Sequence, residues 1–166
     1  AGLAISEVAD AILPNVVSVT IDFNEGIVAI TADETLDVTP TSNVNLSNFF
    51  IGNMLFTRDI NLPGADIVNG NDAYTFHLKL TETQRANALR LSSVPGGDGG
   101  EVVLQVDTGA VKDIAGNPNP FVTNGLVAIE LPDVSQPFAE SAEIFYGTGL
   151  LIVKANETLD LSPANS

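Results

Sequence analysis

A short stretch of this chain occurs twice, and the distance between the copies sets the size of the folding unit. "ADETLDVTP" begins at Ala32 and "ANETLDLSP" begins at Ala155, a shift of 123 positions. Over positions 26–40 and 149–163 the same shift gives seven identities in fifteen without a gap. Solenoid repeats are shorter, at roughly 20 to 50 residues, whereas a unit of this length is a whole domain. The repeat therefore predicts a tandem array of domains.

The same period predicts how the chain is divided. "AGLAISE" at the start of the sequence aligns with "NGLVAIE" at 124–130, which places the end of one unit there. We expect residues 1–14 to be the end of a preceding repeat and its link, and residues 15–131 to be a complete domain. Residues 132–166 would then be the N-terminal part of the next repeat. The chain is thus expected to be an excerpt of a longer array.

Alternating apolar and polar residues predict that the complete domain is made of β-strands. In "NVVSVTIDF" (15–23), every second residue from Val17 to Phe23 is apolar, as in a half-buried strand. The turn "NEG" leads into a second strand at 27–32, which predicts a hairpin. Further strands are expected at 73–80, 101–107 and 125–131, and "AEIFYG" with "LLIVKA" repeats the first hairpin.

One segment carries the signals of a helix. In "LTETQRANALRL" (80–91), Thr81 is a capping residue and Gln84 completes a capping box. Four apolar residues would then face the core: Leu80, Ala88, Leu89 and Leu91. Many short strands with one short helical crossing segment predict an all-β fold, an antiparallel β-sandwich.

The charge balance excludes several classes of partner. Six Lys and Arg stand against 21 Asp and Glu, a formal net charge of −15. Such a surface offers no cationic patch to phosphate, so we expect neither nucleic acid nor anionic membranes as partners. The absence of cysteine excludes disulfides, thiolate metal sites and cysteine catalysis. No apolar run reaches the length of about 18 residues that a membrane span needs.

The stretch "DIAGN" (113–117) predicts a turn that is rich in oxygen ligands. Asp113 can accept from backbone N–H groups two residues ahead, as in an Asx-type turn, and Gly116 supplies a positive φ. Asn117 is biased toward an extended backbone because a proline follows it. The carboxylate and the amide could also hold Ca²⁺. A purely structural turn and a calcium site both remain open.

The stretch "VDTGAVKDIAGNPNP" (106–120) resembles the closing motif of immunoglobulin-like tandem repeats in large cell-surface proteins, such as S-layer proteins, adhesins and flagellar-hair proteins. "LTETQRANAL", "PGGDGGEVVLQVD" and "DETLDVTP" are similar to those repeats as well, so the resemblance covers residues 17–131. It implies an immunoglobulin-like sandwich that serves as a spacer or assembly module, often stiffened by calcium. The resemblance supplies no catalytic residues.

Calcium is the one cofactor for which the sequence offers candidate ligands. It takes about six to eight oxygen ligands, and the chain has many but no EF-hand spacing. Glu34 and Asp37 recur as Glu157 and Asp160. Each pair is either an acidic turn that protects a sheet edge or a calcium-binding pair at a junction between domains. The candidate calcium ligands are Glu34, Asp37, Asp107, Asp113 and Asn117.

Catalysis is not expected. Glu34 with Asp37, or Asp107 with Asp113, could be cast as the paired carboxylates of a glycosidase. Sugar sites usually carry aromatic platforms, however, and this chain has no Trp and only two Tyr. His77 is the single histidine, on the polar face of an expected strand and without an evident acid–base partner.

The expected function is structural. The chain would be an immunoglobulin-like repeat of a long extracellular filament, appendage or surface layer, located outside the cell or at its surface. Its partners would be neighbouring repeats and copies of the same protein, and the sequons at Asn45 and Asn156 are candidate sites for glycans. The alternative is an adhesin module that binds a glycan or a protein through the loops at 62–72 and 94–100.

Overall fold

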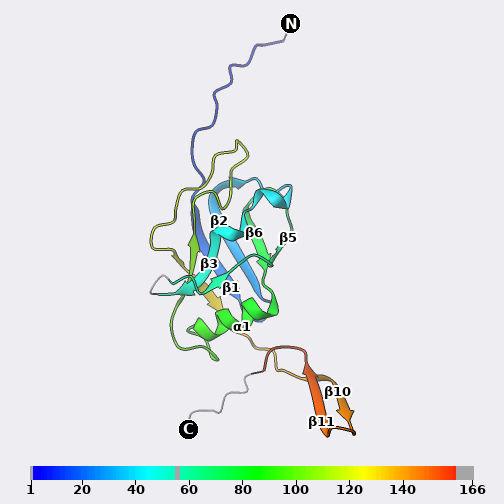
Figure 1. Ribbon diagram of the computed structural model, residues 1–166. Coiled ribbons are helices and arrows are strands. Elements are labelled where there is room, and N and C mark those ends of the chain that lie inside the picture. Colours follow the sequence, from blue (N-terminus) through cyan, green and yellow to red (C-terminus); the bar gives the residue numbers. More distant parts are fainter. Residues whose placement is uncertain (1, 55–56, 160–166) are drawn as a thin grey trace.

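The structure, a computed structural model, describes residues 2–54 and 57–159 and contains two β-sheets and a separate hairpin (Figure 1). The first sheet has the order β5 (Asp66–Val68), β6 (Ala73–Lys79), β2 (Ile27–Leu36), β1 (Val16–Asp22) and β9 (Ile129–Leu131). The second has the order β4 (Ile60–Asn61), β3 (Phe49–Asn53), β7 (Val102–Val106) and β8 (Leu126–Val127). The hairpin pairs β10 (Ala139–Phe145) with β11 (Leu150–Ala155).

The predicted β-rich class is confirmed. Strands make up 38% of the structure and helices 10%. Neighbouring strands run antiparallel, as predicted, except that β1 and β9 are parallel. Strands β3, β4 and β5 were not predicted, nor were two short 3-10 helices, η1 (Thr41–Asn43) and η2 (Leu46–Asn48). These elements have at most five residues each, too few to show a clear period in the sequence.

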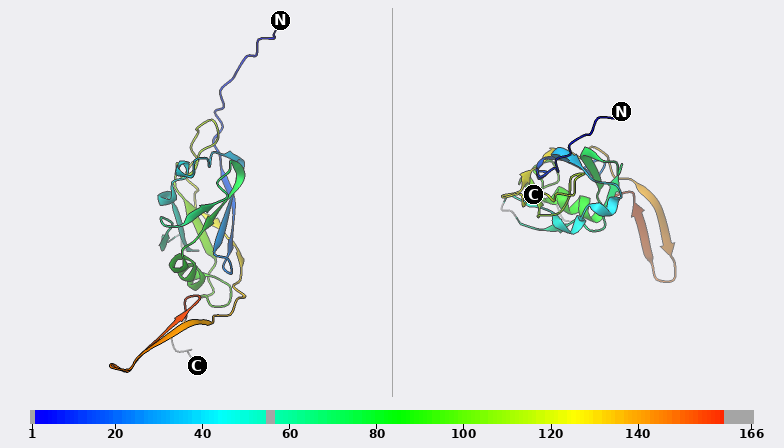
Figure 2. Two further views of the ribbon diagram at one scale, coloured as in Figure 1. Left: turned by 90° about the vertical axis from the view of Figure 1, so that its right-hand side faces the viewer. Right: turned by 90° about the horizontal axis from the view of Figure 1, so that it is seen from above.

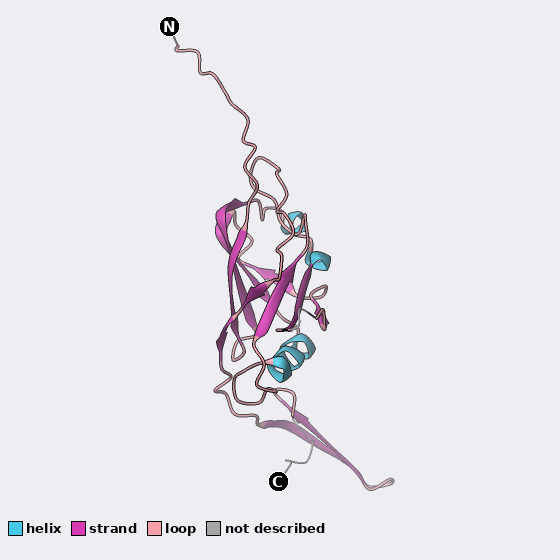
Figure 3. Ribbon diagram, turned by 90° about the vertical axis from the view of Figure 1, so that its left-hand side faces the viewer, coloured by secondary structure: helices cyan, strands magenta, loops and turns pink. Residues whose placement is uncertain are grey.

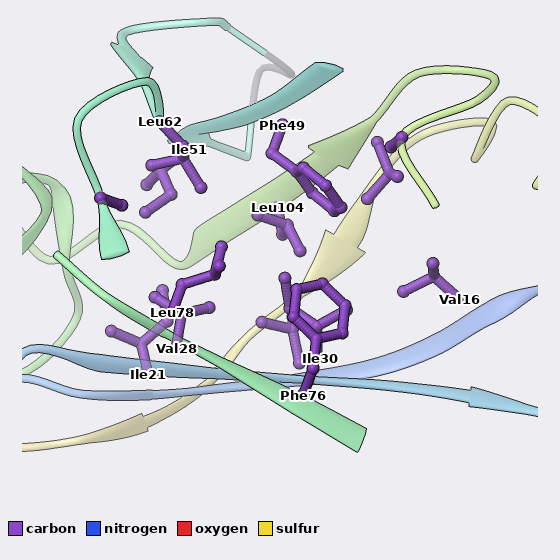
Figure 4. Packing of buried hydrophobic residues seen from close by; sticks show 14 of the residues in the cluster. Val16, Ile21, Val28, Ile30, Phe49, Ile51, Leu62, Phe76, Leu78 and Leu104 are labelled. Atoms are coloured by element: carbon purple, nitrogen blue, oxygen red, sulfur yellow. The ribbon is translucent and has the colours of Figure 1, made fainter. Parts of the chain in front are cut away.

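The two sheets pack face to face around an apolar core (Figure 4). The buried side chains include Ile21, Val28, Ile30, Phe76 and Leu78 from the first sheet and Phe49, Ile51 and Leu104 from the second. The rings of Phe49 and Phe76 meet edge to face, with their centroids 6.1 Å apart. Aromatic pairs favour this geometry, so the contact joins the two sheets across the core.

A β-bulge corrects the predicted orientation of one side chain. The register between β1 and β2 shifts between Val16 and Ser18. Because an extra residue reverses the alternation of side chains, Val16 is buried and Val17 is 50% exposed. The prediction that Val17 faces the core is therefore wrong, whereas Val19 and Phe23 lie inside as predicted.

The strand predicted at 125–131 is divided between the two sheets. Leu126–Val127 pairs with β7 in the second sheet, and Ile129–Leu131 runs beside β1 in the first. Ala128, which is 8% exposed, lies at the crossing, and its N–H donates to the carbonyl of Val102 at 2.8 Å. The segment therefore links the two sheets at the end of the domain.

The predicted helix is confirmed as α1 (Glu82–Leu91), with its capping box. The Thr81 hydroxyl accepts from the N–H of Gln84, and the Gln84 side chain accepts from the N–H of Thr81. Ala88 is fully buried. None of the described helices has the length and apolar character that crossing a membrane requires. Figure 3 shows α1 at the end of the sheets from which the hairpin β10–β11 projects.

The hairpin β10–β11 reproduces β1–β2 with an offset of 123 residues. The pair Val16 and Ala32 corresponds to the pair Ala139 and Ala155, and the bulge after Val16 recurs after Ala139. A hydrogen bond that closes the open end of the hairpin, which we call the capping bond, recurs as well. Asp33 accepts from the N–H of Asn15 at 2.8 Å, and Asn156 accepts from the N–H of Phe138 at 2.8 Å. The second hairpin lies outside the two sheets (Figure 2).

Two substitutions in β6 test the core. Phe76→Ala should lower the free energy of unfolding by about 3–5 kcal/mol, because it removes a fully buried ring and leaves a cavity. Tyr74→Ala, two positions away and 58% exposed, should change it by less than about 0.5 kcal/mol. Urea denaturation followed by circular dichroism measures both. Losses of equal size would contradict the burial of Phe76 in the core and the exposure of Tyr74 near the end of the strand.

Candidate functional site

The buried guanidinium of Arg85, on α1, is the centre of a charged cluster at the end of the domain. Its Nε donates to Glu82 at 2.7 Å, and its Nη1 donates to the carbonyl of Phe23 at 2.9 Å and to Asp133 at 2.6 Å. Its Nη2 donates to Glu82 at 2.9 Å and to Glu157 at 3.2 Å. A guanidinium has five N–H donors, so every one of them has an acceptor here. We call Arg85, Glu82, Asp133 and Glu157 the arginine clasp.

The clasp is a strongly ionic site. Hydrogen bonds from Arg85 lower the pKa of Glu82 to about 2, and the pKa of Arg85 is raised, chiefly by Glu82. The side chains of Asp133 and Glu157 are only 12% and 13% exposed. Since three carboxylates surround one guanidinium, neutralising Arg85 would leave two nearly buried anions without their counter-ion.

The clasp joins segments that are far apart in the sequence. Glu82 and Arg85 belong to α1, whereas Asp133 lies in the link after β9 and Glu157 follows β11. Two further contacts cross the same junction. The N–H of Thr158 donates to Glu82 at 2.9 Å, and Asn24 accepts from the hydroxyl of Ser135 at 2.8 Å. The hairpin β10–β11 is therefore held to the two-sheet domain by ionic and polar contacts.

A second charged cluster lies at the opposite end of the β1–β2 hairpin. Asp10, Glu34 and Asp113 each offer a carboxylate oxygen within 4.8 Å of the other two. Glu34 is in β2, Asp113 is in the "DIAGN" turn, and Asp10 comes from the extended segment before β1. None of the salt bridges among the described residues includes these three carboxylates. We call them the acidic cluster.

The carboxyl groups of Glu34 and Asp113 lie in different environments, which shift their pKa values in opposite directions. Burial, followed by the charges of Asp113, Asp10 and Asp33, raises the pKa of Glu34. The Oε1 atom of Glu34 is buried and has no hydrogen-bond partner among the described residues. Burial also opposes ionisation of Asp113, but hydrogen bonds from Asn117 and from the backbone of Gly116 and Ala115 together lower the pKa of Asp113. A cation at this position would relieve the repulsion and satisfy the unpaired oxygen of Glu34.

The structure brings together three of the five predicted calcium ligands. Glu34 and Asp113 are in the acidic cluster, and Asn117 donates to Asp113 through its backbone N–H at 2.8 Å and its amide at 2.7 Å. Asp107 instead forms a salt bridge with Arg58 at 2.5 Å. The backbone N–H of Asp37 donates to a carbonyl in the neighbouring loop, and its carboxylate is not part of the cluster.

Calcium binding remains a prediction. The cluster supplies the hard oxygen ligands that Ca²⁺ prefers, with three carboxylates close together. The turn predicted around Asp113 is present, with Gly116 at φ +90°. The Asp113 carboxylate accepts from the N–H of Asn117 at 2.8 Å, and the backbone of Ala115, two residues ahead as predicted, also bonds it. Asp160, the copy of Asp37, lies outside the described residues.

Asp10, Arg85 and Asp133 were not among the predicted site residues. The period itself carried a signal for two of them, because Asp10 and Asp133 are identical residues 123 positions apart. Arg85 gave no comparable signal, since its partners Asp133 and Glu157 are 48 and 72 residues away along the chain. An arginine in a helix is usually exposed, and only the fold buries this one.

Both sequons are accessible, and each asparagine also has a structural role. Asn45 is exposed and accepts from the N–H of Ser47 at 3.2 Å, which caps η2. Asn156 is exposed and caps the open end of β10–β11. Glycosylation at either residue remains a prediction.

Comparison with known proteins assigns no family. No family model matches the chain, and no match is found among curated proteins or solved structures. The duplicated hairpin and the two charged clusters are therefore the features from which a function is inferred.

Glu34→Gln tests the acidic cluster through its pH dependence. Because the pKa of Glu34 is raised above its usual 4.5 in the folded state, this group favours folding most below pH 4.5, and the benefit is lost as pH rises through the raised pKa. In chelator at pH 7, Glu34→Gln should raise the thermal unfolding midpoint by a few degrees, and the gain should vanish near pH 3. Glu101→Gln, an exposed change just before β7, should shift the midpoint at neither pH.

Adding Ca²⁺ to the same assay tests the calcium prediction. The midpoint of the wild-type chain should rise, and that of Glu34→Gln should respond much less. A wild-type midpoint that does not differ between calcium and chelator would contradict the calcium site. A fall in the midpoint of Glu34→Gln at pH 7 without calcium would contradict the repulsion inferred for the cluster.

Proposed function

We propose that this chain is part of a tandem array of immunoglobulin-like β-sandwich modules whose role is structural, in an extracellular filament, appendage or surface layer. The observation that carries the proposal is the duplicated hairpin. Its register, its bulge and its capping bond all recur at the 123-residue period that the sequence shows independently. Two unrelated hairpins would not share all three features.

The exposed faces of β10–β11 support a further module. Ile21 is fully buried in the first hairpin, whereas its counterpart Ile144 is 50% exposed. Ile30 is likewise buried, and its counterpart Val153 is 52% exposed. In the first hairpin these side chains are covered by the second sheet. A chain that carries such a hairpin fits an array in which a second sheet covers each copy.

The link between the domain and the second hairpin favours a semi-rigid array. Only seven residues, 132–138, separate β9 from β10, and Pro132 and Pro137 restrict their backbone. The arginine clasp then holds this short stretch at Asp133, and Asn24 holds it at Ser135. Such a joint would set the length and direction of the array, which is the mechanical role proposed here.

Spin labels can measure how rigid the joint is. The chain has no cysteine, so Thr83→Cys on α1 and Thr148→Cys in the β10–β11 turn provide two unique attachment points. The distance distribution between the labels should be narrow in the otherwise wild-type chain. Arg85→Gln should broaden it at least about twofold, because the clasp loses its only cation. Arg90→Gln, an exposed arginine of the same helix, is the matched control and should leave the distribution unchanged.

Two results would contradict the proposal. A broad distribution in the otherwise wild-type chain would exclude a joint that transmits direction. Flanking sequence in the parent gene without further copies at the 123-residue period would exclude a tandem array. Preservation of the narrow distribution in Arg85→Gln would show that the link, rather than the clasp, fixes the angle.

A further inference from the structure

The acidic cluster contains the same two residues that bind Arg85 in the clasp, one period earlier. Asp10 corresponds to Asp133 and Glu34 corresponds to Glu157 at the shift of 123. Both aspartate side chains form the same local turn with the backbone that follows them. Oδ1 of Asp10 accepts from the N–H two residues ahead at 3.0 Å, and so does Oδ1 of Asp133. In Asp133 the other oxygen, Oδ2, accepts from Arg85 at 2.6 Å.

The two glutamates match as well. Each lies two residues beyond the last pair of a hairpin of identical register, at Ala32 and at Ala155. Each also directly follows a capping residue, Asp33 before Glu34 and Asn156 before Glu157. In both glutamates Oε1 is buried without a hydrogen-bond partner among the described residues. In Glu157 the other oxygen, Oε2, accepts from Arg85 at 3.2 Å. The acidic cluster thus contains the counterparts of two of the three carboxylates that surround Arg85 in the clasp.

We propose that the acidic cluster is a receptor for a guanidinium, and that the partner is an arginine on the helix of a second like-built module, equivalent to Arg85 on α1. The inference rests on the proposed function, because it uses the array to identify the partner. In the proposed contact, Asp10 accepts a hydrogen bond from one Nη atom of the partner's arginine, and Glu34 accepts one from the other Nη atom. Asp113 adds a third negative charge beside them.

Residues 2–8, which precede the acidic cluster in the sequence, would also pack against a like-built module. The shift of 123 aligns Leu3 with Leu126 and Ile5 with Ala128. Leu126 and Ala128 pack on the core of the domain, whereas Leu3 is 96% exposed and Ile5 is 85% exposed. A like-built module would therefore bury residues 2–8 in the place that β8 and β9 occupy here, and its arginine would lie beside Asp10.

A guanidinium fits this site better than an ammonium group. The two acceptors belong to different segments, and a planar fork with several fixed donors can reach both at once, whereas an ammonium is a single point of charge. A metal ion is the rival occupant, since three carboxylates within 4.8 Å are also suitable for Ca²⁺. The internal precedent favours the guanidinium, because the equivalent residues bind an arginine within this same chain.

A titration of the full chain with methylguanidinium tests the receptor. Backbone amide resonances of residues 10, 34 and 113 should shift and saturate, while methylammonium at the same ionic strength should bind at least about fivefold more weakly. Glu34→Gln and Asp10→Asn should each weaken methylguanidinium binding about fivefold or more. Asp10 lies in the exposed segment before β1, so its substitution leaves the core intact, and Glu101→Gln should bind as the wild type does.

Several outcomes would overturn the inference. One is equal affinity for methylguanidinium and methylammonium. Another is methylguanidinium binding that is unchanged in both Asp10→Asn and Glu34→Gln. A third is displacement of methylguanidinium by Ca²⁺ at a Ca²⁺ concentration more than tenfold lower than that of methylguanidinium. Each can be told apart from failure of the array proposal. If the spin-label distance across the Arg85 joint is narrow while the titration fails, the array stands and only the receptor is lost. A broad distance with a successful titration would leave a guanidinium site without a rigid joint.

Discussion

Burial of the inward face of the β1–β2 hairpin determines where both charged clusters lie. Ile21, Val28 and Ile30 pack against the second sheet, so the hairpin cannot slide without moving its apolar face out of the core. Its turn then supplies the carbonyl of Phe23 to the arginine clasp, and its open end supplies Glu34 to the acidic cluster. One apolar constraint thereby positions two polar sites at opposite ends of the domain.

The two clusters differ in what compensates their carboxylates. In the clasp, Arg85 uses all of its donors, and the surrounding carboxylates are held at hydrogen-bond distance. In the acidic cluster, Asn117 compensates Asp113, while the pKa of Glu34 is raised and none of the salt bridges among the described residues includes Glu34. Desolvated carboxylates are stable only when they are paired, so the difference identifies the acidic cluster as the less satisfied of the two.

Local signals in the sequence predicted local structure, and contacts across long separations escaped them. The capping box of Thr81 and Gln84 and the first hairpin depend on neighbouring residues, and both are present as predicted. The outward position of Val17 depends on a bulge, and the division of 125–131 depends on two sheets competing for one strand. In the site, Glu34 and Asp113 could be predicted as acidic candidates, but their meeting with Asp10 required the fold.

The excess of negative charge would bear on how the proposed array is assembled. With a net charge of −15, two copies of this chain side by side repel each other. Where a guanidinium lies among carboxylates, as Arg85 does among Glu82, Asp133 and Glu157, the repulsion is offset locally. In the proposed array, charge would therefore favour contact at the joints over lateral aggregation.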